Sequence, residues 1–167
     1  DKIGVNQLFL VEKTSDDVGY YQGKADLSAA FILIDQIWFK NVKASYGFRY
    51  EDLALKVSND KMEEDIAEIN KPAYLPSMNL NYVFTEKMNL RAAYFGSVNR
   101  PEFRELAPFA FYVFDKNAEI RGNKNLKVAK IDNFDLRYEF YPTGLQLFSV
   151  GTFYKRIINP VEYSIDI

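Results

Sequence analysis

The sequence predicts an all-β protein, an antiparallel up-and-down meander of about six strands. Three observations support this prediction. Apolar and polar residues alternate with a period of two over much of the chain. The alternating segments are about ten residues long, and they are separated in turn by short polar connections and by long segments.

The alternation is clearest in the second half of the chain. In the segment 133–140 every second residue is Phe, Leu or Tyr, and the residues between them are Asn, Asp, Arg and Glu. The predicted strands cover 23–34, 41–57, 75–84, 89–98, 132–141 and 144–157. Short turns are expected at 85–88 and 141–144, where Pro142 and Gly144 suit a tight turn. Long loops are expected at 58–74 and 99–131.

These strand lengths and unequal connections are typical of an outer-membrane β-barrel, which has short turns at one end and longer loops at the other. A tilted strand needs about 9–11 residues to cross the membrane. A soluble sheet with one buried face shows the same alternation. Periodicity therefore leaves two alternatives open: a membrane barrel, or a soluble β-barrel or β-sandwich that binds a ligand.

The composition of the chain argues against several classes of function. The chain of 167 residues has a net charge of −2, which argues against nucleic-acid binding. It contains neither histidine nor cysteine, and so it lacks the commonest general base and the commonest soft metal ligands. We therefore expect no enzymatic activity, no cofactor and no metal site. Tyr and Phe are abundant, 12 and 14 residues, and Tyr is favoured where a side chain is half apolar and half wet.

Collinear motifs in the segments 75–114 and 122–162 add a resemblance. They are Arg-Pro at 100–101, Phe-Arg-Glu-Leu at 103–106, Gly-Asn-Lys-Asn-Leu at 122–126, Asn-Phe-Asp-Leu at 133–136, Phe-Tyr-Lys at 153–155 and Asn-Pro at 159–160. In this order and spacing they resemble the late barrel of TonB-dependent outer-membrane receptors. Lys124 departs from the pattern, because the family usually has proline there.

The resemblance implies that the whole chain, 1–167, is one partial segment of a 22-stranded barrel in the outer membrane of a Gram-negative bacterium. It implies active uptake of a siderophore, vitamin, oligosaccharide or peptide. The expected partners are outer-membrane lipid, the plug and other barrel strands of the receptor, and the TonB system. No plug or TonB box is visible in the sequence, which starts at Asp1 without methionine, so we expect a processed product or a fragment. Six strands cannot close a barrel, and self-association is therefore expected.

Two groups are candidate contacts for a ligand or for the plug. Arg100, Glu102, Arg104 and Glu105 follow a strand that Pro101 ends. The resemblance places this segment in or over the lumen, where the charges either fix the loop to the barrel interior or contact a ligand directly. The aromatic residues that follow could form a platform for a flat ligand, or could serve loop packing or an aromatic girdle. They are Phe109, Phe111, Tyr112 and Phe114.

The alternation assigns further residues to opposite faces. The residues expected to face lipid or its interface are Tyr82, Phe84, Phe134, Leu136, Tyr138, Phe140 and Tyr154. The charges expected to form ion pairs in a polar lumen are Arg49, Glu51, Asp135, Arg137 and Glu139. Two acidic clusters, Asp16–Asp17 and Glu63, Glu64, Asp65 and Glu68, are expected on solvated loops, because they lack the spacing of a calcium-binding loop.

Overall fold

The computed structural model describes residues 8–11, 21–59, 64–113 and 118–163. Nine strands and one short helix lie in this part of the chain. The strands of the main sheet are β1 (Leu8–Val11), β2 (Gln22–Trp38), β3 (Val42–Asn59), β4 (Glu64–Thr85), β5 (Met88–Asn99), β8 (Ala129–Phe140) and β9 (Phe148–Ile158). Helix α1 (Phe103–Leu106) and the strand pair β6 (Ala110–Val113) and β7 (Ala118–Arg121) lie between β5 and β8.

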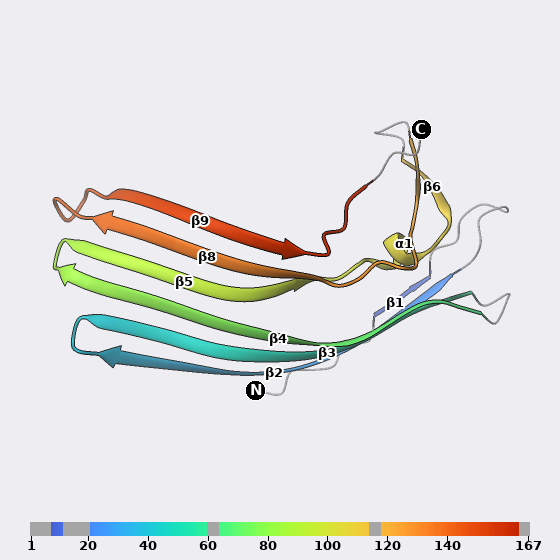
Figure 1. Ribbon diagram of the computed structural model, residues 1–167, viewed down its shortest axis with the longest axis horizontal. Coiled ribbons are helices and arrows are strands. Elements are labelled where there is room, and N and C mark those ends of the chain that lie inside the picture. Colours follow the sequence, from blue (N-terminus) through green and yellow to red (C-terminus); the bar gives the residue numbers. More distant parts are fainter. Residues whose placement is uncertain (1–7, 12–20, 60–63, 114–117, 164–167) are drawn as a thin grey trace.

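The main sheet is antiparallel throughout, with the strand order β1-β2-β3-β4-β5-β8-β9. The prediction of an all-β antiparallel meander is therefore confirmed, with six long strands and one short edge strand. In Figure 1 the turns β2–β3, β4–β5 and β8–β9 lie together at one end of the long sheet, whereas α1 and β6 lie at the other end. Among the described residues, no helix has the length and apolar character to cross a membrane.

The predicted loop at 58–74 is wrong. Strand β3 continues to Asn59 and β4 already begins at Glu64, and the two strands pair from there onward. The acidic residues of this segment suggested a solvated loop, but the segment from Ala67 onward alternates as a strand. Glu68 and Asn70 are exposed, whereas Ala67 and Ile69 are buried. The acidic cluster therefore lies largely on a strand, with Glu63 and Asp16–Asp17 outside the described residues.

Other boundaries differ less. β2 extends to Trp38, beyond the expected end at 34, and β9 begins at Phe148, because the turn after β8 takes up 141–147. The segment expected as a loop at 99–131 contains α1, β6, β7 and the first residues of β8. At the β2–β3 turn, Phe39 and Lys40 have positive φ angles of 52° and 64°, the backbone conformation that a tight hairpin requires.

The register places unlike side chains on the two faces of the sheet. Residues directly opposite each other in an antiparallel ladder point to the same side. One row across the sheet is Trp38, Val42, Tyr82, Leu90, Tyr138 and Val150. We call the face with this row the outer face. The next row belongs to the opposite, inner face and consists of Ile37, Lys43, Asn81, Arg91, Arg137 and Gly151.

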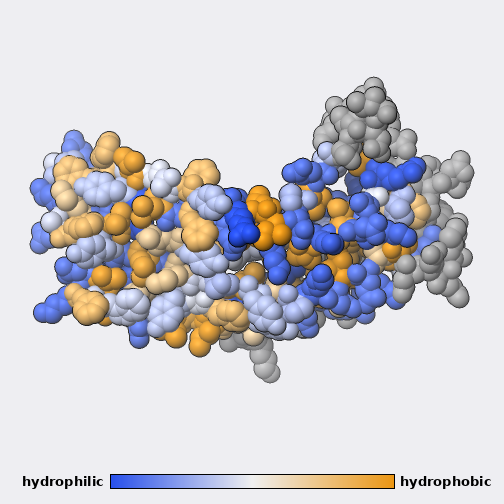
Figure 2. All heavy atoms as spheres, viewed as in Figure 1, coloured by the Kyte–Doolittle hydropathy of each residue, from blue (hydrophilic) through white to orange (hydrophobic). Residues whose placement is uncertain are grey.

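The distribution of apolar and polar residues between the two faces inverts towards the end of the sheet that carries α1. On β3 the inner-face residues Leu53, Leu55 and Val57 are buried, and Asp52 and Lys56 on the outer face are exposed. The largest cluster of buried residues lies here rather than on the long apolar outer face, whose large side chains remain partly or fully exposed. Figure 2 shows hydrophobic side chains at the surface along the strands away from this end.

Pro76 separates β4 from β5 at the start of this region. The β4–β5 ladder extends from Thr85 to Ser77 and stops beside Pro76, which has no N–H to continue it. Strands β2, β3 and β4 continue together without β5. Their inner face is thereby free to receive the segment that follows β5.

Candidate functional site

The segment 100–128 connects β5 to β8, and we call it the cap. It begins with Arg100 and Pro101 and then forms the single turn of α1. The backbone N–H of Glu102 donates a hydrogen bond to Oε2 of Glu105 at 2.9 Å, which stabilises the start of this turn. These two predicted site residues therefore contact each other.

The cap packs on the inner face of β3 and β4. Leu106 and Ala107 at the end of α1 are fully buried, in one cluster with Leu55, Val57 and Ile69. The partly buried residues packed against this cluster are Ala25, Ile66, Phe103, Phe109, Leu126 and Val128. The apolar inner face of the strand extension is therefore covered by the chain's own connection.

Two glycines allow the close approach that this packing needs. A Cβ on Gly23 of β2 would lie 2.5 Å from the ring of Phe103. A Cβ on Gly122 would lie 2.6 Å from the carbonyl oxygen of Arg104, and the next residue, Asn123, donates its backbone N–H to the Glu105 carbonyl at 2.6 Å. The returning part of the cap is thus docked directly onto α1. These glycines were not predicted as site residues, although Gly122 begins one of the motifs noted above.

An ion-pair cluster ties the start of the cap to the sheet. Glu51 on the inner face of β3 is only 7% exposed. Its Oε1 lies 2.6 Å from Nε of Arg49, and its Oε2 pairs with Nη2 of Arg100. One carboxylate therefore binds two guanidinium groups, one from β3 and one from the residue that follows β5.

A second polar cluster lies on the inner face near the hairpin end. Nε of Arg91 is 3.1 Å from Oε2 of Glu139, and the hydroxyl of Tyr141 donates a hydrogen bond to the same oxygen at 3.0 Å. Hydrogen bonding to this carboxylate, with a smaller effect of burial, raises the pKa of the Tyr141 phenol above its usual value. Arg91 was not predicted as a partner of Glu139. It lies directly opposite Arg137, and this register was not readable from one sequence.

The aromatic residues of the cap do not form one open platform in the described part of the structure. Phe109 stacks on Tyr21, with ring centroids 6.2 Å apart and an angle of 23° between the rings, and it packs against the buried cluster. Phe111 and Tyr112 belong to β6, whose backbone pairs with β7; only the backbone is described there. Phe114 lies outside the described residues. Arg104 is exposed on α1.

The residues expected to face lipid share the outer face. Tyr138 lies opposite Leu90, which lies opposite Tyr82, and Phe134 lies opposite Tyr154. Ring contacts join several of them: Tyr82 to Phe84 at 4.4 Å, Tyr94 to Phe134 at 4.8 Å and Phe134 to Tyr154 at 6.1 Å between centroids. Leu136 is 45% exposed and Tyr154 63% exposed.

The described residues offer no group of three Asp, Glu, His or Cys side chains that could hold a metal ion. The arrangement combines a fixed, cation-bearing cap over the inner face with a broad exposed apolar outer face. The cap is suited to binding at the end of a lumen. The outer face is suited to a hydrophobic environment outside that lumen.

Comparison with known proteins identifies the family of the chain. No curated protein sequence matches the chain. A family model described as "Outer membrane protein beta-barrel family" matches residues 5–166. This match indicates that the chain is located in the outer membrane of Gram-negative bacteria, and the chain belongs to the outer membrane protein β-barrel family.

Proposed function

We propose that the chain is a barrel-wall segment of a TonB-dependent outer-membrane receptor that actively imports a scarce nutrient, such as a siderophore, vitamin, oligosaccharide or peptide. The observation that carries this proposal is the cap. It is held on the inner face at one end of the strands by the Glu51–Arg100 ion pair and by the buried Leu106. A fixed loop at the end of a lumen can select a ligand before transport, whereas a purely structural wall needs no such loop.

In this proposal the outer face contacts lipid. From Val42 to Tyr50 on β3, apolar and aromatic residues occupy every outer-face position. Nine residues at about 3.3 Å each, tilted by about 40°, cross roughly 23 Å, close to the apolar band of about 25 Å in outer-membrane barrels. The polarity inversion at Glu51 and Asp52 then marks the outer membrane surface, with the cap on the extracellular side and the short hairpin turns in the periplasm.

The edges of the sheet support a larger assembly. In the described part of the chain, β9 has no neighbour besides β8, and β2 has no second neighbour from Asp26 to Trp38. Seven strands are fewer than the eight of the smallest membrane barrels. We propose that the remaining strands of the receptor pair with these edges and that its plug lies against the inner face. Copies of the isolated chain would associate through the same edges.

The alternative, a soluble ligand-binding β-barrel or sandwich, needs a core on the apolar face of the strands. The described residues bury their core instead on the opposite face, beneath the cap, and leave Phe134, Leu136 and Tyr154 exposed. This arrangement favours lipid over a protein core as the environment of the outer face. It assigns no group to a chemical reaction, so the proposed function is transport rather than catalysis.

The proposal is tested in cells that carry the full-length receptor. Accumulation of labelled siderophores, cobalamin, oligosaccharides and peptides is compared between wild-type cells, cells lacking the receptor gene and cells lacking TonB. We expect one ligand class to accumulate only when both proteins are present. Accumulation that depends on the receptor but is unchanged without TonB, or no receptor-dependent accumulation of any class, would contradict the proposal.

A further inference from the structure

We propose that the extracellular end of the inner face carries a binding site for an anionic group, formed by Arg49, Arg100 and Lys71. This inference rests on the proposed receptor function and names its ligand class: a nutrient that carries carboxylate or phosphate groups. Binding at this site can be measured without transport, so the two proposals can fail separately.

The charge balance of the site is positive. Arg49 and Arg100 both pair with the single carboxylate of Glu51. The ε-ammonium group of Lys71 belongs to none of the ion pairs between described residues. Three cations against one carboxylate leave an excess of two positive charges, so an anion that enters the site meets net attraction.

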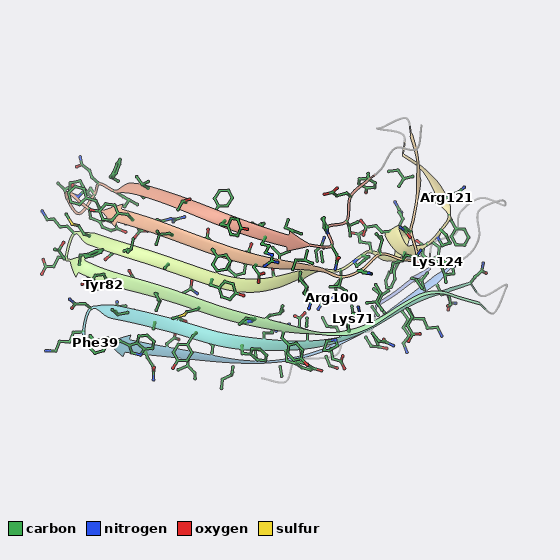
Figure 3. The ribbon with its side chains drawn as sticks, in the orientation of Figure 1. Phe39, Lys71, Tyr82, Arg100, Arg121 and Lys124 are labelled. Atoms are coloured by element: carbon green, nitrogen blue, oxygen red, sulfur yellow. The ribbon has the colours of Figure 1, made fainter. Side chains whose placement is uncertain are left out.

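The register places Arg49 and Lys71 on either side of Glu51 along the inner face. Glu51 lies opposite Ala73 on β4, and Leu53 lies opposite Lys71, so Lys71 is the diagonal neighbour of Glu51 on the inner face. Such neighbours are about 7–8 Å apart, within reach of long side chains. Arg100 reaches Glu51 from the end of β5, and Figure 3 shows Arg100 and Lys71 in the same part of the molecule, where the cap meets the sheet.

The guanidinium groups keep access to solvent beside a nearly buried carboxylate. The neighbours of Glu51 on the inner face are Ala29 on β2 and Ala73 on β4, both small residues. The side chains of Arg49 and Arg100 are 39% and 24% exposed, so each has access to solvent while its carboxylate partner is nearly buried. A guanidinium group that is held in place by one carboxylate can use its other N–H groups to bind a further carboxylate or phosphate oxygen.

Among the described residues, no carboxylate besides that of Glu51 forms an ion pair with Arg49, Arg100 or Lys71. The carboxylate of Glu102 accepts the backbone N–H of Glu105 at the start of α1. Glu105 accepts the backbone N–H of Glu102, which holds its carboxylate at the start of α1. Asp52 and Glu68 alternate with the inner-face residues and so lie on the outer face.

The experiment measures binding of citrate and of inorganic pyrophosphate, as carboxylate and phosphate probes, to the full-length receptor in detergent by titration calorimetry. Lys71→Gln is the test variant, because Lys71 is exposed and outside the ion pairs that hold the cap. Lys43→Gln is the matched control: it removes another exposed inner-face lysine, at the hairpin end of β3. Lys71→Arg tests whether a cation restores binding.

We expect Lys71→Gln to weaken binding of at least one probe about tenfold, the effect of losing one charge-assisted hydrogen bond. Lys43→Gln and Lys71→Arg should bind within about twofold of wild type, and higher salt should weaken wild-type binding more than binding to Lys71→Gln. Preference for one probe identifies the anionic group.

Equal effects of Lys71→Gln and Lys43→Gln, or no binding of either probe, would overturn the inference. A receptor that imports only neutral nutrients with TonB would overturn it while leaving the proposed function intact.

Discussion

Arg100 and Glu51 are 49 residues apart in the sequence and form an ion pair that joins the start of the cap to β3. We predict that Glu51→Gln loosens the cap, because it leaves Arg49 and Arg100 close together without a carboxylate between them. The expected loss is about 1–3 kcal/mol in the free energy of cap opening, between the values for surface and buried pairs. Hydrogen exchange of the backbone amides of α1, measured on the full-length protein in detergent, reports this change.

Asp26→Asn is the control for this variant. It removes the Lys24–Asp26 pair, whose side chains are 54% and 38% exposed, and pairs of this kind contribute less than about 1 kcal/mol. If exchange of the α1 amides is equal in Glu51→Gln and Asp26→Asn, the ion pair does not hold the cap.

Gly122→Ala should displace the returning part of the cap. The new Cβ would meet the backbone carbonyl oxygens of Arg104, Glu105 and Ala107, which cannot move without disturbing α1. Gly144→Ala is the matched control, because a Cβ there has no atom within 4 Å. We expect faster protease cleavage within the cap of Gly122→Ala and wild-type cleavage in Gly144→Ala. Wild-type cleavage in both variants would show that the close approach at Gly122 is dispensable.

Leu106→Ala should destabilise the cap without preventing insertion of the strands. Leu106 is fully buried between α1 and the inner face, and truncating a buried leucine typically costs about 2–5 kcal/mol. Leu145 is 100% exposed in the β8–β9 turn, so Leu145→Ala should be neutral. Cap exchange and the yield of folded protein in the outer membrane are measured together. A large loss of folded protein in Leu106→Ala would mean that the cap core is needed for barrel assembly.

Tyr141 should ionise at a higher pH than an ordinary tyrosine. Its phenol donates to Glu139, so the neutral form is favoured and the folded-state pKa is raised. This contribution to stability is present below the ordinary tyrosine pKa and is lost as the pH rises through the folded-state pKa. Glu139→Gln should lower the pKa of Tyr141, measured by phenolate absorbance with Tyr141→Phe to assign the signal. An unchanged pKa in Glu139→Gln would rule out the carboxylate as the cause.

Sequence periodicity predicted which residues of β3 and β8 share a face, because a strand whose faces meet different environments repeats every two residues. It did not do so for β2, where Phe31, Leu33 and Ile37 are exposed on the inner face. The acidic residues were misleading at 64–74, where Ile69 packs against the cap and Glu68 lies on the opposite face. The run of acidic residues in this long segment suggested a solvated loop. The contact that explains them comes from α1, far along the chain, and no local pattern contains it.

The candidate site was predicted only in part for a similar reason. The pairing of Glu51 with Arg49 follows from their spacing on one strand, two residues apart on one face. The second partner, Arg100, depends on where Pro76 ends the β4–β5 ladder and lets the cap turn inward. Phe109 was open to two interpretations because its packing partner, Tyr21, lies in a different part of the sequence.

A charged residue introduced on the outer face should lower the free energy of unfolding far more than one introduced on the inner face of the same strand. Met78 and Asn79 are neighbours near the middle of the proposed membrane-crossing part of β4, and Met78 shares the outer face with Tyr46 and Tyr94. Met78→Arg would place a guanidinium in lipid, at a cost of about 2–4 kcal/mol near the bilayer centre. Asn79→Arg adds the same charge on the inner face, opposite Ser45 and Ala93, where water and polar groups can solvate it. Urea unfolding of the full-length protein in lipid vesicles should therefore show a marked loss of stability for Met78→Arg and little for Asn79→Arg. Equal losses would mean that the two faces do not meet lipid and lumen, since the two substitutions add the same group to adjacent positions of one strand.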